Sequence, residues 1–342
     1  MDFELSQDQR DLQDGIRAVL EGSLSLETSR GREGRDDVVD PKGWTALLDA
    51  GVFGLFVPES EGGVGLGLAE GVLVAEEMGR VLVPGPVLST MALAPILDAA
   101  RDGIAHGLFE APARGATAPG LVEHPDSIHA LVLLPPLEDP VTEPTLIEHG
   151  DLRYSQVLEP LDPFTPLGVL QEPYPVGVSL EGTSSPQLRQ RAMVLTAGFQ
   201  VGIATACVEQ ATAYAKGREQ FGRPIGSFQA IKHLLADALC RSELARSAVY
   251  AAAVTLDDPV VATREADTLG CSVTQLQWRV VAGAKMLADE AAITNARTAI
   301  QVHGGMGFTW EVPMHLFLKR ARVLSSTFGT RSQLADMVAA LI

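Results

Sequence analysis

The sequence KGREQFGRPIGSFQ, residues 216–229, lies between two of the longest helical patterns in the chain. Before it, apolar residues recur every three or four positions across 187–216, which is the spacing of a buried helix face. After it, Ser227 is expected to cap a second helix. Apolar residues of that helix are predicted to face inward: Ile231, Leu234, Leu235, Leu239 and Leu244. A third helix is predicted over 261–302 and a last one from Thr330. Helices far longer than the average of about 11 residues are typical of an antiparallel bundle.

The part of the chain that precedes this bundle has two further regions. The first 104 residues contain shorter helical patterns, one of them capped by Ser6 and another by Asp40. Between about 105 and 182, proline and glycine recur every few residues, and β-prone runs appear at 130–134 and 176–180. We therefore predict an α+β, mostly α chain with an N-terminal helical domain (1–104), a small irregular β domain (105–182) and a C-terminal helix bundle (183–342).

Composition and charge exclude several classes of protein. The 342 residues include 26 Lys and Arg against 43 Asp and Glu, and the formal net charge of −17 argues against nucleic acid or an anionic membrane as a partner. The longest uncharged runs, 81–97 and 192–208, are interrupted by proline or glycine, so no membrane span is expected. The chain opens without a signal-peptide pattern, and Cys207, Cys240 and Cys271 form no CxxC. These features predict a cytoplasmic protein with reduced thiols.

Residues 216–232 are basic within this acidic chain. They carry a local net charge of +3, from Lys216, Arg218, Arg223 and Lys232 against Glu219. A basic loop that leads into a helix N-terminus is suited to hold a phosphate. An ordinary charged loop between two helices would have the same composition, and these residues alone leave both interpretations open.

A second unusual stretch is Gln301-Val-His-Gly-Gly-Met-Gly, residues 301–307. A helix stop and a tight turn explain one or two of its three glycines, whereas a third suggests that a ligand approaches the backbone closely. His303 is interpreted as a residue that orders the turn rather than as a base. Neither the seven histidines nor the three cysteines show metal-ligand spacing, so no metal site is predicted.

Together these motifs resemble the acyl-CoA dehydrogenase family over nearly the whole chain. Arg218-x-Gln-Phe-Gly with Gln229, and Gln301-x-x-Gly-Gly, match the two C-terminal FAD motifs of the family, and residues 54–65 and 76–80 match its N-terminal domain. The resemblance implies an N-terminal helical domain, a reduced central β domain and a C-terminal four-helix bundle. It also implies FAD-dependent α,β-desaturation of an acyl-CoA, with an electron-transfer flavoprotein as acceptor.

The resemblance further implies which residues contact FAD. Arg218 would pair with the pyrophosphate, Phe221 and Phe228 would pack near the adenine, and the Gly304-Gly305 turn would present backbone groups. The full set of implied cofactor-binding residues is Arg218, Gln220, Phe221, Phe228, Gln229, Gln301, His303, Gly304 and Gly305.

Both positions at which the family places its catalytic carboxylate are apolar in this chain. The residue before Gly329-Thr330 is Phe328, and the position 26 residues before Arg218 is Ala192. Removal of the thioester α-proton requires a base, so no residue of this chain is assigned a catalytic role. The segment expected to form the β domain also lacks the family's flavin-ring motif.

In this family each FAD is shared between two subunits, and this chain retains only the motifs of one half. The leading hypothesis is therefore an FAD-completing subunit of an α2β2 acyl-CoA dehydrogenase, which resembles the smaller, non-catalytic subunit of actinobacterial enzymes of steroid side-chain β-oxidation. One alternative is a self-sufficient homomeric flavoenzyme whose base is a carboxylate such as Glu219 or Glu311. Another is a non-enzymatic binding protein on the same fold.

Overall fold

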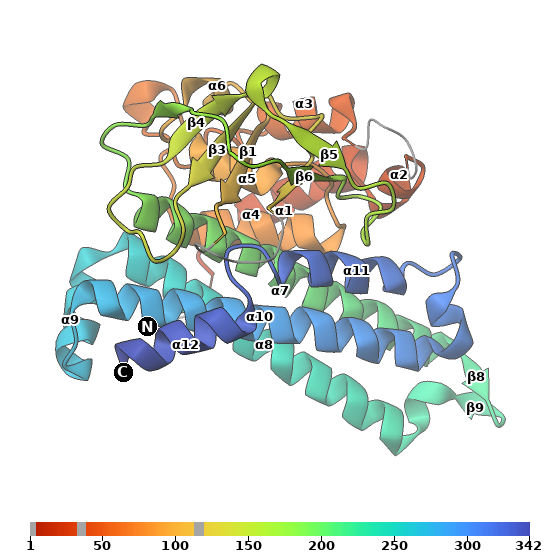
Figure 1. Ribbon diagram of the computed structural model, residues 1–342. Coiled ribbons are helices and arrows are strands. Elements are labelled where there is room, and N and C mark those ends of the chain that lie inside the picture. The colour runs from red at the N-terminus through yellow and green to blue at the C-terminus, as the bar shows by residue number, and fades with distance from the viewer. Residues whose placement is uncertain (1–4, 33–38, 113–119) are drawn as a thin grey trace. The chain divides into compact units, whose positions relative to one another are not determined.

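The computed structural model describes residues 5–32, 39–112 and 120–342, and its elements follow the predicted order of helices, short strands and long helices (Figure 1). The N-terminal helices are α1 (Gln7–Ser23), α2 (Leu26–Arg30), α3 (Pro41–Asp49), α4 (Leu68–Arg80), α5 (Val87–Leu93) and α6 (Asp98–Arg101). The strands that follow are β1 (His106–Glu110), β2 (Leu121–Glu123), β3 (Ala130–Leu134), β4 (Thr145–Glu148), β5 (Tyr154–Gln156), β6 (Leu167–Leu170) and β7 (Val178–Ser179). The C-terminal elements are α7 (Ser185–Gly217), β8 (Glu219–Gln220), β9 (Arg223–Pro224), α8 (Gln229–Asp257), α9 (Pro259–Leu269), α10 (Val273–His303), α11 (Met314–Leu324) and α12 (Arg331–Leu341).

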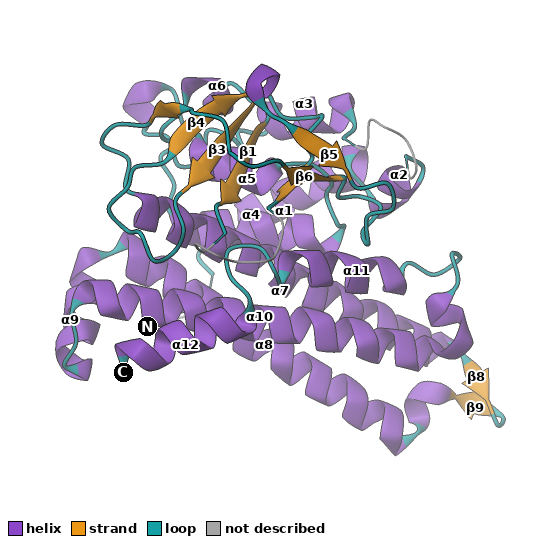
Figure 2. Ribbon diagram, viewed as in Figure 1, coloured by secondary structure: helices purple, strands orange, loops and turns teal. Residues whose placement is uncertain are grey.

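The chain forms two compact units, and helices α1 and α7 each contribute residues to both. The helical unit contains Met1–Asp14, Leu68–Leu82 and Met193–Ile342, and the mixed unit contains Gly15–Gly67 and Val83–Ala192. Strands β1–β7 belong to the mixed unit, and the β8–β9 hairpin belongs to the helical unit, at one end of its long helices (Figure 2). The three-part division at residues 104 and 182 remains a prediction.

The mixed unit holds two small sheets. One has the strand order β1-β3-β4-β7, in which β1 and β3 are parallel and the other pairs antiparallel, and the other is the antiparallel sheet β2-β6-β5. The β-prone run at 130–134 forms β3, and part of the run at 176–180 forms β7. A hydrophobic cluster lies among these strands: Phe109, Val122, Ile128, Leu131 and Leu170.

In the helical unit, α4 and α7 pack with their backbones in direct contact. A Cβ atom at Gly79 of α4 would lie 1.9 Å from the carbonyl oxygen of Phe199, and one at Gly202 of α7 would lie 2.0 Å from that of Glu76. No side chain fits into such gaps unless the helices move apart, because protein interiors are close-packed. The two glycines therefore set the separation of these helices.

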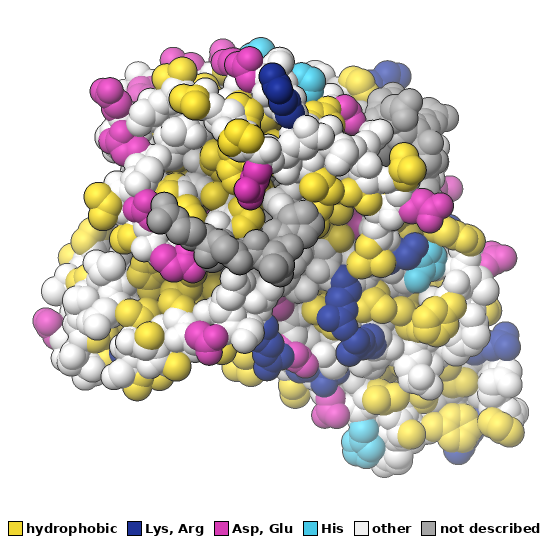
Figure 3. Space-filling model, in the orientation of Figure 1, with side chains coloured by type: hydrophobic (Ala, Val, Ile, Leu, Met, Phe, Trp, Pro, Cys, Tyr) yellow, Lys and Arg dark blue, Asp and Glu magenta, His cyan; other side chains and the backbone are white. Residues whose placement is uncertain are grey.

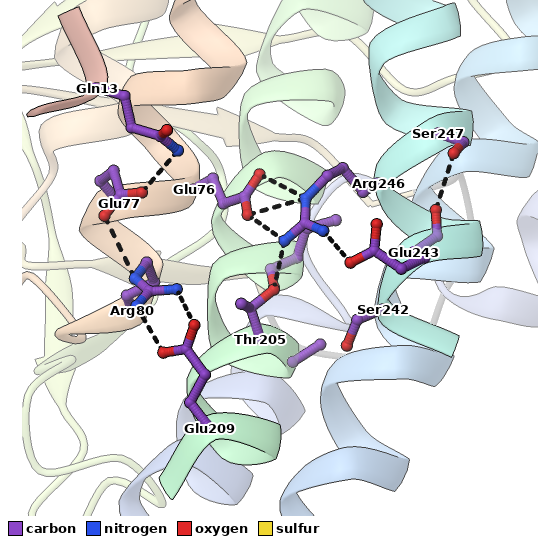
Figure 4. Close-up of polar contacts among 12 residues, drawn as sticks. Gln13, Glu76, Glu77, Arg80, Thr205, Glu209, Ser242, Glu243, Arg246 and Ser247 are labelled. Atoms are coloured by element: carbon purple, nitrogen blue, oxygen red, sulfur yellow. Dashed lines mark hydrogen bonds and ion pairs between the residues drawn. The ribbon is translucent and has the colours of Figure 1, made fainter. Parts of the chain in front are cut away.

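Charged residues join α4 to α7 and α8 beside this contact (Figure 4). Arg246 of α8 donates hydrogen bonds to Glu76 of α4 at 2.6 Å and to the Thr205 hydroxyl of α7 at 2.9 Å. Arg80 of α4 donates two hydrogen bonds to Glu209 of α7, at 3.0 and 2.6 Å. The Glu76 carboxylate is buried, so its pairing with Arg246 compensates for the hydration that it lost on folding.

The third long helix predicted over 261–302 is in fact two helices. Helix α9 ends at Gly270, which adopts a left-handed conformation with φ of 65°. Helix α10 then begins with a capping box, in which the side chains of Ser272 and Gln275 each accept a hydrogen bond from the other residue's backbone N–H. The left-handed glycine and the capping box together end one helix and start the next, and the apolar periodicity does not record this break.

The beginning of α8 also differs from the prediction. Its N-cap is Phe228 rather than Ser227, which lies in a short 3-10 turn. Leu239 and Leu244, predicted to face inward, are 51% and 59% exposed, whereas Ile231, Leu234 and Leu235 are half-buried. Residues 229–237 include no buried side chain. Apolar residues do recur at helical spacing along α8, but the fold of the single chain buries only some of them.

Helix α7 is long and apolar enough to cross a membrane by length and composition alone. Within its most apolar 18-residue window, however, 83% of the residues are buried inside the protein. Such burial is typical of the core helix of a water-soluble protein.

Candidate functional site

The basic loop after α7 folds as a β-hairpin. Its strands β8 and β9 are joined by Phe221 and Gly222, whose φ angles of 53° and 76° are both positive. Two central residues with positive φ are the requirement of a type I′ hairpin turn. The turn holds the Phe221 side chain out into solvent, where it is 93% exposed.

The hairpin is fixed onto the end of α7 by backbone contacts. The Arg218 N–H donates to the carbonyl of Tyr214 at 2.8 Å, and the Ile225 N–H donates to the carbonyl of Arg218 at the same distance. Gly226 lies close to α7, since a Cβ atom there would be 2.9 Å from the Ala215 carbonyl oxygen. The motif that carries Arg218 is therefore held by the structure of the chain itself.

An aromatic pair and an arginine form the outer part of the hairpin. Phe221 and Phe228 meet edge to face with ring centroids 6.2 Å apart, and the Arg223 guanidinium lies 4.1 Å from the centroid of the Phe228 ring. This cation–π contact engages Arg223 within the hairpin. Lys216 and Arg218 are exposed and form no ion pair among the residues that the structure describes. They leave the loop with positive charge available to an anion.

Helix α8 begins directly after this loop. Its N-cap, Phe228, makes no side-chain capping hydrogen bond, and Gln229 at the first helical position is exposed. The N–H groups of a first helical turn lack partners within the helix, and the helix dipole adds partial positive charge there. The predicted combination of a basic loop and a helix N-terminus is thus present, with Phe228 in the place expected of Ser227.

The glycine turn follows the end of α10, and its glycines serve different purposes. Gly304 has φ of 64° and ψ of −139°, a conformation that residues with side chains rarely adopt. Gly307 is crowded, because a Cβ atom there would lie 2.6 Å from the Ile300 carbonyl oxygen. Gly305 has neither a positive φ nor any neighbour within 4 Å of a Cβ atom. The fold of this chain does not require glycine at 305, whereas close approach of a ligand would.

His303 orders this turn. Its ring is largely buried, its Nδ1 lies 2.7 Å from the carbonyl oxygen of Ala299, and it stacks on Tyr214 with ring centroids 4.2 Å apart. The Tyr214 hydroxyl also donates to Sδ of Met306 at 3.8 Å. Sequence reasoning did not select Tyr214. The available signal was an aromatic residue one helical turn before Arg218, at the end of a predicted helix.

Tyr214 thus brings the two motifs to the same end of the helical unit. Its carbonyl accepts the N–H of Arg218, and its ring lies on His303 beside Gly304. The implied cofactor-binding residues Gln220, Gln229 and Gln301 are also exposed. One surface therefore combines an exposed arginine, an uncapped helix N-terminus and a glycine turn, which together suit a phosphate-containing ligand.

The two positions at which the family places its catalytic carboxylate hold buried apolar side chains in this chain. Phe328 is 9% exposed and has a positive φ of 58°, and Ala192 of α7 is 3% exposed. The alternative bases lie elsewhere, since Glu219 is exposed on β8 and Glu311 is exposed after the glycine turn.

A buried ion pair supports the turn that contains Phe328. The Lys285 ammonium of α10 donates to both carboxylate oxygens of Asp289, at 2.7 and 2.9 Å, and to the carbonyl of Leu324 at the end of α11. Burial lowers the pKa of Lys285 and raises that of Asp289, and the attraction between the two charges opposes both shifts. The pair connects α10 to the end of α11, four residues before Phe328.

Comparisons with known proteins agree with this description. A family model for the acyl-CoA dehydrogenase C-terminal domain matches residues 189–342, and one for the N-terminal domain matches residues 6–104. Acyl-CoA dehydrogenase IpdE2 of Mycobacterium tuberculosis is 37% identical over 286 residues, which cover 81% of this chain and 79% of that protein.

Solved structures with the same fold include subunits of complexes. A chain of the ChsE4-ChsE5 complex of Mycobacterium tuberculosis has a TM-score of 0.78 and 22% identity, with 99% of this chain and 98% of that chain covered. A chain described as a Tcur3481-Tcur3483 steroid ACAD variant has a TM-score of 0.77 and 23% identity, with 98% and 97% covered. These matches confirm the predicted fold class, a mostly helical chain of the acyl-CoA dehydrogenase fold.

Proposed function

Because this chain belongs to the acyl-CoA dehydrogenase family, whose members are FAD-dependent oxidoreductases, we propose that it completes the flavin site of a heteromeric acyl-CoA dehydrogenase. Its partner would supply the catalytic base and the rest of the flavin pocket. The observation that carries the proposal is a contrast within the chain. Seven of the nine residues assigned to FAD binding are exposed, whereas both family base positions are buried and apolar.

The proposed reaction is the α,β-desaturation of an acyl-CoA thioester. A carboxylate takes the proton from the α-carbon, and the electrons of that C–H bond form the new carbon–carbon double bond as a hydride leaves the β-carbon. FAD supplies, when bound, the acceptor for this hydride. Phe328 and Ala192 have no group that can take a proton, so the base belongs to the partner.

The residues present in this chain fit the phosphate end of FAD. Arg218 and the N–H groups of the first turn of α8 would hold the pyrophosphate, and Phe221 and Phe228 offer ring surface to the adenine. Gly305 leaves room for close approach to the backbone, which nothing in the chain itself requires. In this role the chain binds and orients the cofactor and takes no part in proton transfer.

The proposed assembly is an α2β2 heterotetramer that acts in the cytoplasm and passes electrons to an electron-transfer flavoprotein. Two solved structures of the same fold support a heteromeric partner, since one is described as the ChsE4-ChsE5 complex and the other as Tcur3481-Tcur3483. The second description names a steroid acyl-CoA dehydrogenase, which supports a steroid side-chain CoA as the substrate to test first.

Co-expression with a candidate catalytic acyl-CoA dehydrogenase subunit, such as any encoded next to this chain, tests the proposal. We expect a complex that contains one FAD per heterodimer and oxidises acyl-CoA thioesters, whereas either chain alone lacks stoichiometric flavin. Steroid and straight-chain acyl-CoAs would be compared as substrates. One FAD per chain in the protein purified alone, or turnover by that protein alone, would contradict the proposal and favour a self-sufficient enzyme.

A further inference from the structure

Met306, in the glycine turn after α10, is the most exposed methionine among the residues that the structure describes. Its side chain is 43% exposed, whereas Met286 and Met337 are half-buried. The other described methionines are 0% exposed: Met78, Met91, Met193 and Met314. Met306 lies between Gly305 and Gly307, at the same end of the helical unit as the β8–β9 hairpin. Figure 3 shows hydrophobic side chains at the surface at the lower right, over this hairpin.

The sulfur of Met306 contacts the residue that connects the two cofactor motifs. The Tyr214 hydroxyl donates a hydrogen bond to Sδ of Met306 at 3.8 Å, and the Tyr214 ring stacks on His303 with centroids 4.2 Å apart. The backbone of Met306 is also held, since its carbonyl accepts the N–H of Thr309 at 3.0 Å and the Thr309 hydroxyl at 2.9 Å. A chemical change at this sulfur therefore acts directly on Tyr214.

We infer that Met306 is a redox-sensitive modification site, at which hydrogen peroxide converts the thioether to the sulfoxide and thereby lowers the affinity of this surface for flavin. The sulfur lone pair attacks one peroxide oxygen, the O–O bond breaks, and the sulfur is oxidised by two electrons. The second oxygen leaves as water and takes both peroxide protons. The effect on flavin rests on the proposed function, whereas the site of oxidation does not.

Exposure selects Met306 for this reaction. The oxidant must reach the sulfur, so the rate of oxidation follows the accessibility of the side chain. The fully buried methionines react only when the surrounding structure opens locally, which requires additional free energy. Gly305 and Gly307, on either side of Met306, have no side chains that would shield its sulfur.

The sulfoxide changes the contact with Tyr214. A thioether sulfur is a weak hydrogen-bond acceptor, whereas a sulfoxide is polar and accepts through its oxygen. The added oxygen has to fit beside a hydroxyl that lies only 3.8 Å from the sulfur. The Tyr214 hydroxyl follows this stronger acceptor, and a displaced ring loses part of its stack on His303. The glycine turn then shifts relative to Arg218, and the two motifs no longer fit one cofactor.

Controlled oxidation of the wild-type chain is the direct test. The isolated chain would be treated with hydrogen peroxide, and the oxygen gained by each methionine-containing peptide would be followed over time by mass spectrometry. We expect Met306 to be oxidised about tenfold or more faster than the fully buried methionines. The oxidised chain would then be combined with the catalytic subunit and FAD, and flavin absorbance is expected to report a several-fold loss of flavin per heterodimer.

Met306→Leu and Met337→Leu are a matched pair of control variants. Each keeps an apolar side chain of similar size and is compared with its own untreated sample. After peroxide, Met306→Leu is expected to keep its flavin and Met337→Leu to lose flavin as the wild type does. Both retain the exposed thiol of Cys240, which peroxide also oxidises, so a difference between the variants reports Met306 alone. Methionine sulfoxide reductase is expected to restore flavin binding to the oxidised wild type.

The outcomes separate this inference from the proposed function. Oxidation of Met306 no faster than that of the buried methionines would contradict the modification site, whatever the flavin content. If flavin survives complete oxidation of Met306, or if Met306→Leu loses as much flavin as the wild type, the redox effect is wrong. A complex that contains no flavin before treatment contradicts the proposed function instead, and the oxidation rates still decide whether Met306 is the modification site.

Discussion

The imidazole of His303 stacks on the phenol ring of Tyr214 with centroids 4.2 Å apart and the two planes 26° from parallel. This contact joins the end of α10 to the end of α7, and so joins the glycine turn to the arginine hairpin. Phe308, at the end of the turn, is largely exposed, and Nδ1 of His303 is already engaged with the carbonyl of Ala299. The alignment of the two motifs therefore depends on Tyr214.

Replacing Tyr214 tests that dependence. Tyr214→Ala removes the stack and is expected to lower the free energy of unfolding by about 1–2 kcal/mol and to reduce flavin per heterodimer several-fold. Tyr214→Phe keeps the ring and loses only the weak contact to Met306, so it should retain wild-type flavin content. Flavin absorbance of the purified complex provides the measurement. Equal losses in both variants would show that the hydroxyl, rather than the stack, holds the turn.

Gly304 and Gly305 should respond differently to alanine. Gly305→Ala is expected to change the free energy of unfolding of the isolated chain by less than about 1 kcal/mol, because a Cβ atom there meets nothing, yet to lower the flavin content of the complex. Gly304→Ala should cost about 1–3 kcal/mol in the isolated chain, because its backbone angles suit only glycine. Urea denaturation and flavin absorbance distinguish the two. Full flavin content in Gly305→Ala would show that no cofactor approaches that residue.

The buried pair of Lys285 and Asp289 should show strong coupling. Lys285→Met leaves the buried Asp289 carboxylate unpaired and is expected to lower the free energy of unfolding by about 3–5 kcal/mol. The double variant Lys285→Met with Asp289→Leu should recover most of this loss, because an apolar pair needs no compensation for lost hydration. Lys42→Met, at an exposed position, is the control and should change stability by less than about 0.5 kcal/mol. If the losses of stability measured for Lys285→Met alone and Asp289→Leu alone simply add in the double variant, the two residues are not coupled.

A pH titration should detect Tyr154 in the mixed unit. Burial, together with the hydrogen bond that its hydroxyl donates to Asp126, raises its pKa to about 12, above the usual value near 10. The folded pKa exceeds the unfolded one. The stability contributed by this group is therefore complete below about pH 10 and is lost as the pH rises through about 12. The phenolate absorbance of wild type and Tyr154→Phe measures the titration, and Asp126→Asn should lower the midpoint.

Much of the fold is predictable because the signals are local. The run 130–134 forms β3 over those same residues, and Asp40 caps α3 as expected. The pairing of the strands is not predictable in this way, since partners such as β2 and β6 are distant in sequence. The break between α9 and α10 depends on the backbone conformation of Gly270, and apolar periodicity continues across it.

The candidate site is predictable in its residues but not in its surroundings. The motifs identify Arg218 and Gly304, whereas the contribution of Tyr214 depends on a contact between residues 89 positions apart in the sequence. Periodicity likewise reports that Leu239 belongs to an apolar helix face. It does not report whether that face packs inside its own chain, and Leu239, predicted to face inward, is 51% exposed.

The Phe221 side chain at the tip of the β8–β9 hairpin has a consequence for the cell. The proposed function has the partner subunit and the cofactor cover this ring, so a chain made without its partner would keep a large aromatic side chain in water. Under that proposal, synthesis of the chain would be matched in amount to synthesis of its partner.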